Sequence, residues 1–212
     1  VAKKLGFTFF DTGAMYRSFA WQVLEEKIDP KTEVSRFAFE IKTRGEEKRY
    51  FVSNQDVTEA IRQPQISAAA SQIAAYPEVR SAMVQIQRKL AKGCNAVFEG
   101  RDMGTVVFPN ADLKIFLTAT PAIRAKRRYD ELKCKFPEKR IDFDQILKET
   151  EVRDRNDSTR DVSPLKQAPD AHLMDTSDLS VDEVIEKTLD LVPYPKKKWF
   201  YGFIYWTARI FF

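Results

Sequence analysis

An arginine and an aspartate stand side by side in the glycine-framed segment Gly100-Arg101-Asp102-Met103-Gly104-Thr105. This segment follows residues 96–98, an apolar run typical of a buried strand. In α/β sheets, ligands bind at the ends of the strands. The planar guanidinium group of Arg101 can donate two hydrogen bonds to a phosphate, whereas the carboxylate of Asp102 suits a base amino group or a ribose hydroxyl. The segment alone is compatible with a phosphorylated ligand that carries a polar group, or with a strand-end turn and a surface salt bridge.

Two further clusters combine arginine with a carboxylate. One is Asp11-Thr12-Gly13-Ala14-Met15-Tyr16-Arg17, which follows a β-prone run. The other contains Arg153, Asp157 and Arg160, whose spacing places them on one face if a helix extends that far. Taken alone, the cluster of Arg153, Asp157 and Arg160 could be a surface ion-pair ladder worth less than about 1 kcal/mol. Three such clusters in one domain favour a nucleotide site and phosphoryl transfer, in which an enzyme aligns the reactants and neutralises charge on the transferred group.

The elements that must position these clusters alternate between strands and helices, which predicts a parallel sheet covered by helices on both faces. The expected strands are residues 7–10, 96–98, 113–117 and 173–174, and the expected helices cover residues 14–26, 77–92, 143–155 and the segments that begin at Thr120 and Ser180. Residues 39–43 and 48–52 alternate like a hairpin and interrupt this order. We therefore expect the hairpin to belong to an insertion.

The charge of the chain is unevenly distributed. Its 212 residues, enough for one domain with or without an insertion, include 35 lysines and arginines and 31 acidic residues, a net charge of +4. The excess comes from four basic residues in residues 193–212, so residues 1–192 are balanced. A balanced body lacks the basic face on which affinity for nucleic acids rests. We therefore expect no nucleic-acid partner.

In their order and spacing, three segments resemble bacterial cytidylate kinases. They are residues 11–17, residues 99–109, and residues 153–160 followed by Pro164-Leu165. The resemblance covers about residues 1–192 and implies an α/β P-loop nucleoside monophosphate kinase fold. It further implies a parallel sheet flanked by helices, an acceptor-binding insertion at about 37–92 and a lid at about 121–160. The implied reaction transfers a phosphoryl group from ATP, with Mg²⁺, to CMP or dCMP, giving CDP or dCDP in a cytoplasmic monomer.

The resemblance also implies roles for the residues that match the motifs. Arg153 and Arg160 are expected to act in catalysis, Arg153 beside the transferred phosphate, and no residue of the sequence is assigned to a metal. The expected substrate-binding residues are Arg17, Arg101 and Arg160 for the phosphate, Ser71, Arg80 and Asp102 for cytosine, Thr12 and Tyr16 for the shape of the site, and Asp157 for the ribose.

The chemistry of cytosine agrees with these roles. Its amino group can donate to Asp102, and its O2 and N3 atoms can accept hydrogen bonds from Arg80 and Ser71. Uracil presents an acceptor in place of the amino group, so a buried carboxylate should reject it.

The family's phosphate-binding loop, Gly-x-x-x-x-Gly-Lys-Ser/Thr, does not occur in the sequence. We expect the loop to precede Val1 and residues 1–212 alone to have negligible kinase activity. The alternatives are a non-catalytic nucleotide-binding module of a membrane-associated fusion protein, and a kinase for another monophosphate such as UMP or AMP.

Residues 193–212 differ in composition from the rest of the chain. Three consecutive lysines precede a stretch, residues 199–212, in which eight of fourteen residues are aromatic. Such a segment can lie at a membrane interface, with lysines near anionic lipids, but is too short to span a bilayer. We expect membrane contact through residues 196–212, at the start of a second membrane-associated module. A terminal helix packed on the core is the alternative.

Overall fold

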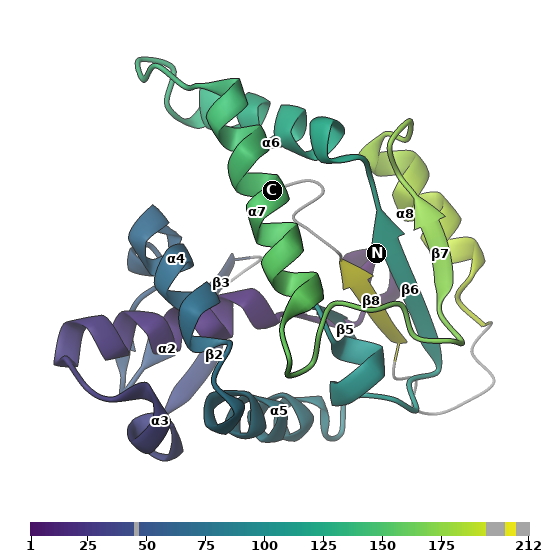
Figure 1. The fold of residues 1–212 in the computed structure, drawn as a ribbon. Coiled ribbons are helices and arrows are strands. Elements are labelled where there is room, and N and C mark those ends of the chain that lie inside the picture. The colour runs from purple at the N-terminus through teal and green to yellow at the C-terminus, as the bar shows by residue number, and fades with distance from the viewer. Residues whose placement is uncertain (45–46, 194–201, 207–212) are drawn as a thin grey trace. The chain divides into compact units, whose positions relative to one another are not determined.

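The computed structural model describes residues 1–44, 47–193 and 202–206, which form two compact units (Figure 1). The first unit contains residues 1–10 and the described part of residues 93–212, and the second contains residues 11–92. Each unit has its own cluster of buried apolar side chains.

The first unit is built on short strands, of which β6 and β5 carry buried apolar runs. Strand β6 (Leu113–Thr118) pairs in parallel with β7 (His172–Asp175) and with β8 (Gly202–Trp206). Strand β1 (Thr8–Asp11) pairs with β5 (Ala96–Glu99). Leu113, Ile115 and Leu117 of β6 are buried, as is residue 97 of β5. Near-continuous apolar runs of this kind are typical of strands in parallel sheets.

The helices of the first unit are α1 (Ala2–Leu5), α6 (Pro121–Lys135), α7 (Phe143–Thr159) and α8 (Val181–Asp190). Their starts follow from local sequence. The Thr120 hydroxyl accepts from the Ile123 amide at the start of α6, and Asp142 caps α7. Ser180 and Glu183 form the capping box of α8. Helices α6 and α7 lie side by side in Figure 1.

The second unit packs helices against a small antiparallel sheet. The sheet contains β2 (Phe39–Arg44), β3 (Glu47–Val52) and β4 (Gln55–Asp56), and the helices are α2 (Thr12–Glu26), α3 (Pro30–Glu33), α4 (Pro64–Ile73) and α5 (Pro77–Ala91). Single 3₁₀ turns, η1 (Val34–Arg36) and η2 (Ala60–Arg62), connect some of these elements. Phe19 of α2 and Val79 and Met83 of α5 are fully buried in its core.

The predicted alternation of strands and helices in the first unit is confirmed, and so is the hairpin, in which Phe39 pairs with Val52. Two segments differ from expectation. Met103–Val107 forms a π-helical turn, η3, in which amides bond to the carbonyl oxygen five residues earlier: Val107 to Asp102 at 3.1 Å and Phe108 to Met103 at 2.6 Å.

The second difference lies in the aromatic tail. Gly202–Trp206 forms a strand, so the terminal helix considered for this segment is wrong there. Aromatic and β-branched residues favour strands, and β6 offers an edge to pair with. Within the described chain, no helix has the length and apolar character needed to cross a membrane. The rest of the predicted membrane-contact segment 196–212 lies outside the described residues.

Candidate active site

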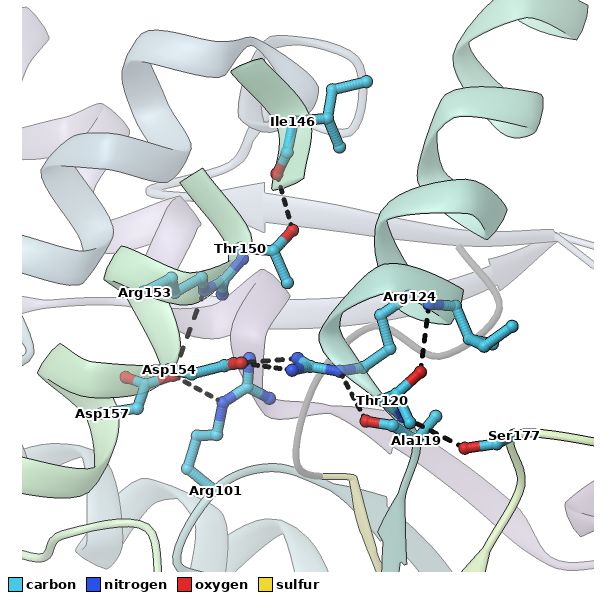
Figure 2. Close-up of polar contacts among 11 residues, drawn as sticks. Arg101, Ala119, Thr120, Arg124, Ile146, Thr150, Arg153, Asp154, Asp157 and Ser177 are labelled. Carbon is cyan, nitrogen blue, oxygen red and sulfur yellow. Dashed lines mark hydrogen bonds and ion pairs between the residues drawn. The ribbon is translucent and has the colours of Figure 1, made fainter. Parts of the chain in front are cut away.

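Arg101 and Asp157 form an ion pair in the first unit, although they lie 56 positions apart in the sequence (Figure 2). Arg101 follows β5, and Asp157 lies near the end of α7. The Arg101 Nε atom donates to Asp157 Oδ2 at 2.8 Å, and the two side chains are only 17% and 12% exposed. The pair therefore joins the glycine-framed segment to α7.

Two more arginines of the predicted cluster surround Asp157. Arg153 Nε lies 4.0 Å from Asp157 Oδ2, and Arg160 Nη1 lies 3.7 Å from Oδ1. Helix α7 ends at Thr159, so Arg160 stands at its C-cap. The spacing of these residues thus does place both arginines beside the carboxylate.

The three arginines determine the protonation state of Asp157. Burial alone would raise the pKa of this carboxyl, but the charge and hydrogen bond of Arg101, with the charges of Arg153 and Arg160, lower the pKa below its usual value. Asp157 is therefore ionised at neutral pH. The cluster keeps an excess of positive charge, which suits a phosphate ligand.

Asp102 lies beside Arg101 and is buried, with 4% of its surface exposed. The π-helical turn starts directly after it and buries Met103 and Gly104. A carboxylate in this setting has little access to water and can select a ligand that donates a hydrogen bond.

The sequence did not single out Arg124 or its partner Asp154 as part of the site. Arg124 Nη1 donates to Asp154 Oδ1 at 2.8 Å, and Nη2 donates to Asp154 Oδ2. Its Nε atom donates to the Ala119 carbonyl oxygen at 3.1 Å (Figure 2). The available signal was the position of Asp154, one turn before Asp157, but nothing local specifies a partner 30 residues away.

In the second unit, Asp11 holds Arg17 at the start of α2. One carboxylate oxygen of Asp11 accepts from the Ala14 amide at 2.8 Å, and the other accepts from Arg17 Nη2 at 3.0 Å. A Cβ atom at Gly13 would lie 3.0 Å from Asp11 Oδ1 and 3.1 Å from Arg17 Nη1, so glycine leaves room for this pair. The buried Nε atom of Arg17 has no hydrogen-bond partner among the described residues. This donor is suited to an incoming anion.

The other predicted residues of the second unit lie on α2, α4 and α5. Arg80 is 4% exposed, donates to the Ala74 carbonyl oxygen at 3.2 Å, and has its guanidinium carbon 5.9 Å from the centre of the Tyr16 ring. Thr12 is buried at the first position of α2, whereas Ser71 is exposed on α4. The structure thus brings Arg80 close to Tyr16.

Parallel strands flanked by helices, with three arginines around the ionised Asp157, form an arrangement expected of a phosphotransferase of the nucleoside monophosphate kinase class. The cytidylate kinase family model matches residues 1–194. The chain belongs to the cytidylate kinase family, and the fold and enzyme class implied by the three motifs are confirmed.

Individual relatives agree with the family model. The chain is 50% identical to a cytidylate kinase of Protochlamydia amoebophila, over 90% of this chain and 87% of that protein. It is 45% identical to a cytidylate kinase of Fervidobacterium nodosum, over 91% of this chain and 87% of that protein. A cytidylate kinase of Caldanaerobacter subterraneus is also 45% identical, with coverage of 91% and 86%.

Proposed function

We propose that this chain binds CMP or dCMP and positions the monophosphate to receive a phosphoryl group from ATP. The observation that carries the proposal is the cluster of Arg101, Arg153 and Arg160 around the ionised Asp157. Arginine forks match the geometry of phosphate oxygens. Membership of the cytidylate kinase family supports ATP as the donor and a pyrimidine monophosphate as the acceptor.

In this proposal, Arg17, Arg101 and Arg160 hold the acceptor phosphate. The buried Arg17 Nε atom, which has no partner among the described residues, supports its part in this role. Asp157 accepts hydrogen bonds from the ribose hydroxyls, for which its ionised state is suited. Arg153, the most exposed residue of the cluster at 49%, lies beside the transferred group and offsets the charge that develops there.

The base is read by Asp102, Arg80 and Ser71, while Thr12 and Tyr16 shape the site. The burial of Asp102 and Arg80 supports their roles, because a buried polar group strongly disfavours a ligand that leaves it unpaired. The exposed Ser71 has no comparable support from burial.

The donor half of the reaction requires ATP and Mg²⁺. In the described parts of the chain, no group of three or more His, Cys, Asp or Glu side chains is arranged to hold a metal ion. We propose that Mg²⁺ arrives with the phosphates of ATP. Helices α6 and α7, in the predicted lid at 121–160, would exclude water from the transfer.

The base-reading role is tested by titrating residues 1–212 with CMP, dCMP, UMP and AMP in a calorimeter. We expect CMP or dCMP to bind at least about tenfold more tightly than UMP. Asp102→Asn, which presents both an acceptor and a donor, should reduce this preference. Equal affinity for CMP and UMP in the unsubstituted chain would contradict the proposal, and an unchanged preference in Asp102→Asn would contradict the role of Asp102.

Transfer itself is tested by the formation of CDP. Residues 1–212 include no Gly-x-x-x-x-Gly-Lys-Ser/Thr loop, and the amides and lysine of that loop bind the donor phosphates. We expect this polypeptide to bind CMP but to form negligible CDP from ATP. Robust CDP formation by purified residues 1–212 would contradict that expectation.

Three further parts of the proposal rest on composition and family resemblance: a cytoplasmic location, a monomeric state, and contact of residues 196–212 with a membrane surface. Sedimentation equilibrium measures the oligomeric state. Co-sedimentation with anionic vesicles, comparing residues 1–212 with the combined variant Lys196→Gln, Lys197→Gln and Lys198→Gln, which keeps strand β8, tests the membrane contact, and equal binding of both polypeptides would contradict it.

A further inference from the structure

The second half of α7 carries the arginine cluster but has little apolar contact to hold it. Ile146 is the buried residue of this 17-residue helix, and it lies in the first half. Phe143 at the start of the helix packs edge-on against Tyr129 of α6, with ring centres 6.0 Å apart. Val152 in the second half is 46% exposed. In this half, polar contacts rather than buried apolar side chains add to what fixes the rotation of the helix about its axis.

Polar contacts to other elements are made by two carboxylates in this half, Asp154 and Asp157. Asp154 accepts both arms of the Arg124 guanidinium fork, and Asp157 accepts from Arg101 (Figure 2). Arg124 is only 7% exposed, and Asp154 is 28% exposed. A two-bond fork in such surroundings constrains both distance and orientation.

Arg124 is itself anchored to the strand ends of the first unit. Its Nε atom donates to the carbonyl oxygen of Ala119, which directly follows β6. One turn further along α6, Arg127 donates to the carbonyl oxygens of Thr176, at 2.6 Å, and Leu179, at 3.2 Å. The start of α6 is thus fixed to the segments that follow β6 and β7. The Arg124–Asp154 fork extends this attachment to α7.

The geometry of a helix links the two carboxylates. Residues three positions apart lie about 4.5 Å apart along the axis and about 60° apart around it. A shift of α7 by one residue would rotate it by about 100° and move Asp157 away from Arg101. Fixing Asp154 therefore fixes where Asp157 and its neighbour Arg153 point.

We propose that Arg124 and Asp154 are positioning residues of the acceptor site, which hold α7 in the rotation that places Asp157 against Arg101. The pair acts through Asp157 and does not touch the ligand. This inference rests on the proposed CMP site, because Asp157 and Arg101 are the residues assigned to the ribose and the phosphate.

The test is a double-mutant cycle on CMP affinity, measured by calorimetry with residues 1–212. We expect Asp154→Asn to weaken CMP binding about tenfold in the unsubstituted background and less than about twofold in an Asp157→Asn background. Arg124→Lys, which keeps the charge but loses the fork, should behave in the same way. Asp130→Asn is the matched control, since it removes the exposed Lys126–Asp130 pair from α6 and should leave affinity unchanged.

A second readout does not depend on the ligand. Carboxyl ¹³C NMR titration of Asp157 should show that its pKa rises towards the usual value in Asp154→Asn and in Arg124→Lys, because Asp157 is no longer held against Arg101. Circular dichroism identifies a variant that fails to fold, in which case the other variant decides.

The possible outcomes separate this inference from the proposed function. A chain that does not bind CMP contradicts the proposed function, while the NMR titration still tests the positioning. The positioning role would be overturned by an unchanged Asp157 pKa combined with either of two results for CMP affinity. One is an unchanged affinity in folded Asp154→Asn and Arg124→Lys. The other is an equal loss of affinity in the unsubstituted and the Asp157→Asn backgrounds.

Discussion

Two aspartate–arginine pairs, one in each unit, look alike in distance but differ in how the chain makes them. Asp11 and Arg17 lie six positions apart, and their contact measures 3.0 Å. Arg101 and Asp157 lie 56 positions apart, and their contact measures 2.8 Å. The first pair is set by the start of one helix. The second exists only after β5 and α7 have been brought together by folding.

This difference has consequences for how each pair responds to change. Asp11 also accepts the Ala14 amide, so its position is maintained by the helix N-terminus even without Arg17. Asp157 depends on contacts from Arg101, Arg153 and Arg160, and two of these three come from its own helix region. We therefore expect the distant cluster to be the more sensitive of the two, both in stability and in ligand binding.

The largest effect is expected from Asp157→Asn. Removing the anion leaves the partly buried guanidinium groups of Arg101 and Arg160 without their counter-ion, which should lower the free energy of unfolding by about 2–4 kcal/mol at pH 7. Urea unfolding followed by circular dichroism measures this. Asp130→Asn, in an exposed pair, should change it by less than about 0.5 kcal/mol.

The same variant should change the response to acid. The folded-state pKa of Asp157 lies below its ordinary value of 3.8, so its stabilisation is complete above that value and is lost as pH falls through the lower, folded-state value. Unfolding curves measured from pH 6 down to pH 2 should therefore show a shallower loss of stability in Asp157→Asn than in the unsubstituted chain. Parallel curves would show that the arginines do not hold the carboxylate ionised.

The contrast between the two pairs also explains how much the sequence could predict. The capping residues Thr120 and Ser180 and the hairpin at 39–52 follow from local patterns, and the structure agrees with each. The placement of Arg153 and Arg160 beside Asp157 follows from helix periodicity. Local patterns could not predict the partner of Asp154, because that contact depends on how α6 and α7 pack.

The segments that differed from expectation have a similar explanation. The π-helical turn at Met103–Val107 depends on amides bonding to the carbonyl oxygen five rather than four residues earlier, and the glycines of that segment gave no indication of it. Strand β8 forms by pairing with β6, which lies about ninety residues earlier, so its β-favouring composition could not show which strand it would pair with. Both cases depend on hydrogen-bond partners that periodicity does not specify.

An intermediate effect is expected when each arginine is replaced by lysine, because lysine keeps the charge but loses the planar fork. Arg101→Lys loses the Nε–H donor to Asp157 and should destabilise the chain by about 1–2 kcal/mol. Arg17→Lys should cost less than about 1 kcal/mol, since the Asp11 cap remains. Urea unfolding compares the two variants directly. If Arg17→Lys proved the more destabilising, the Asp11–Arg17 pair would depend more on the guanidinium geometry than the Arg101–Asp157 pair does.

Two substitutions at Asp11 separate its helix cap from its ion pair, and the smallest effect of all is expected for Asp11→Ser. Asp11→Ser keeps an oxygen that can accept the Ala14 amide but removes the charge facing Arg17, whose side chain is 11% exposed. We expect a loss of about 0.5 kcal/mol for Asp11→Ser and about 1–2 kcal/mol for Asp11→Ala, which removes both contacts. Thermal unfolding measures the difference. Equal losses in the two variants would mean that the ion pair, and not the helix cap, accounts for the stabilisation, so that the local pair would depend on its charges as the distant one does.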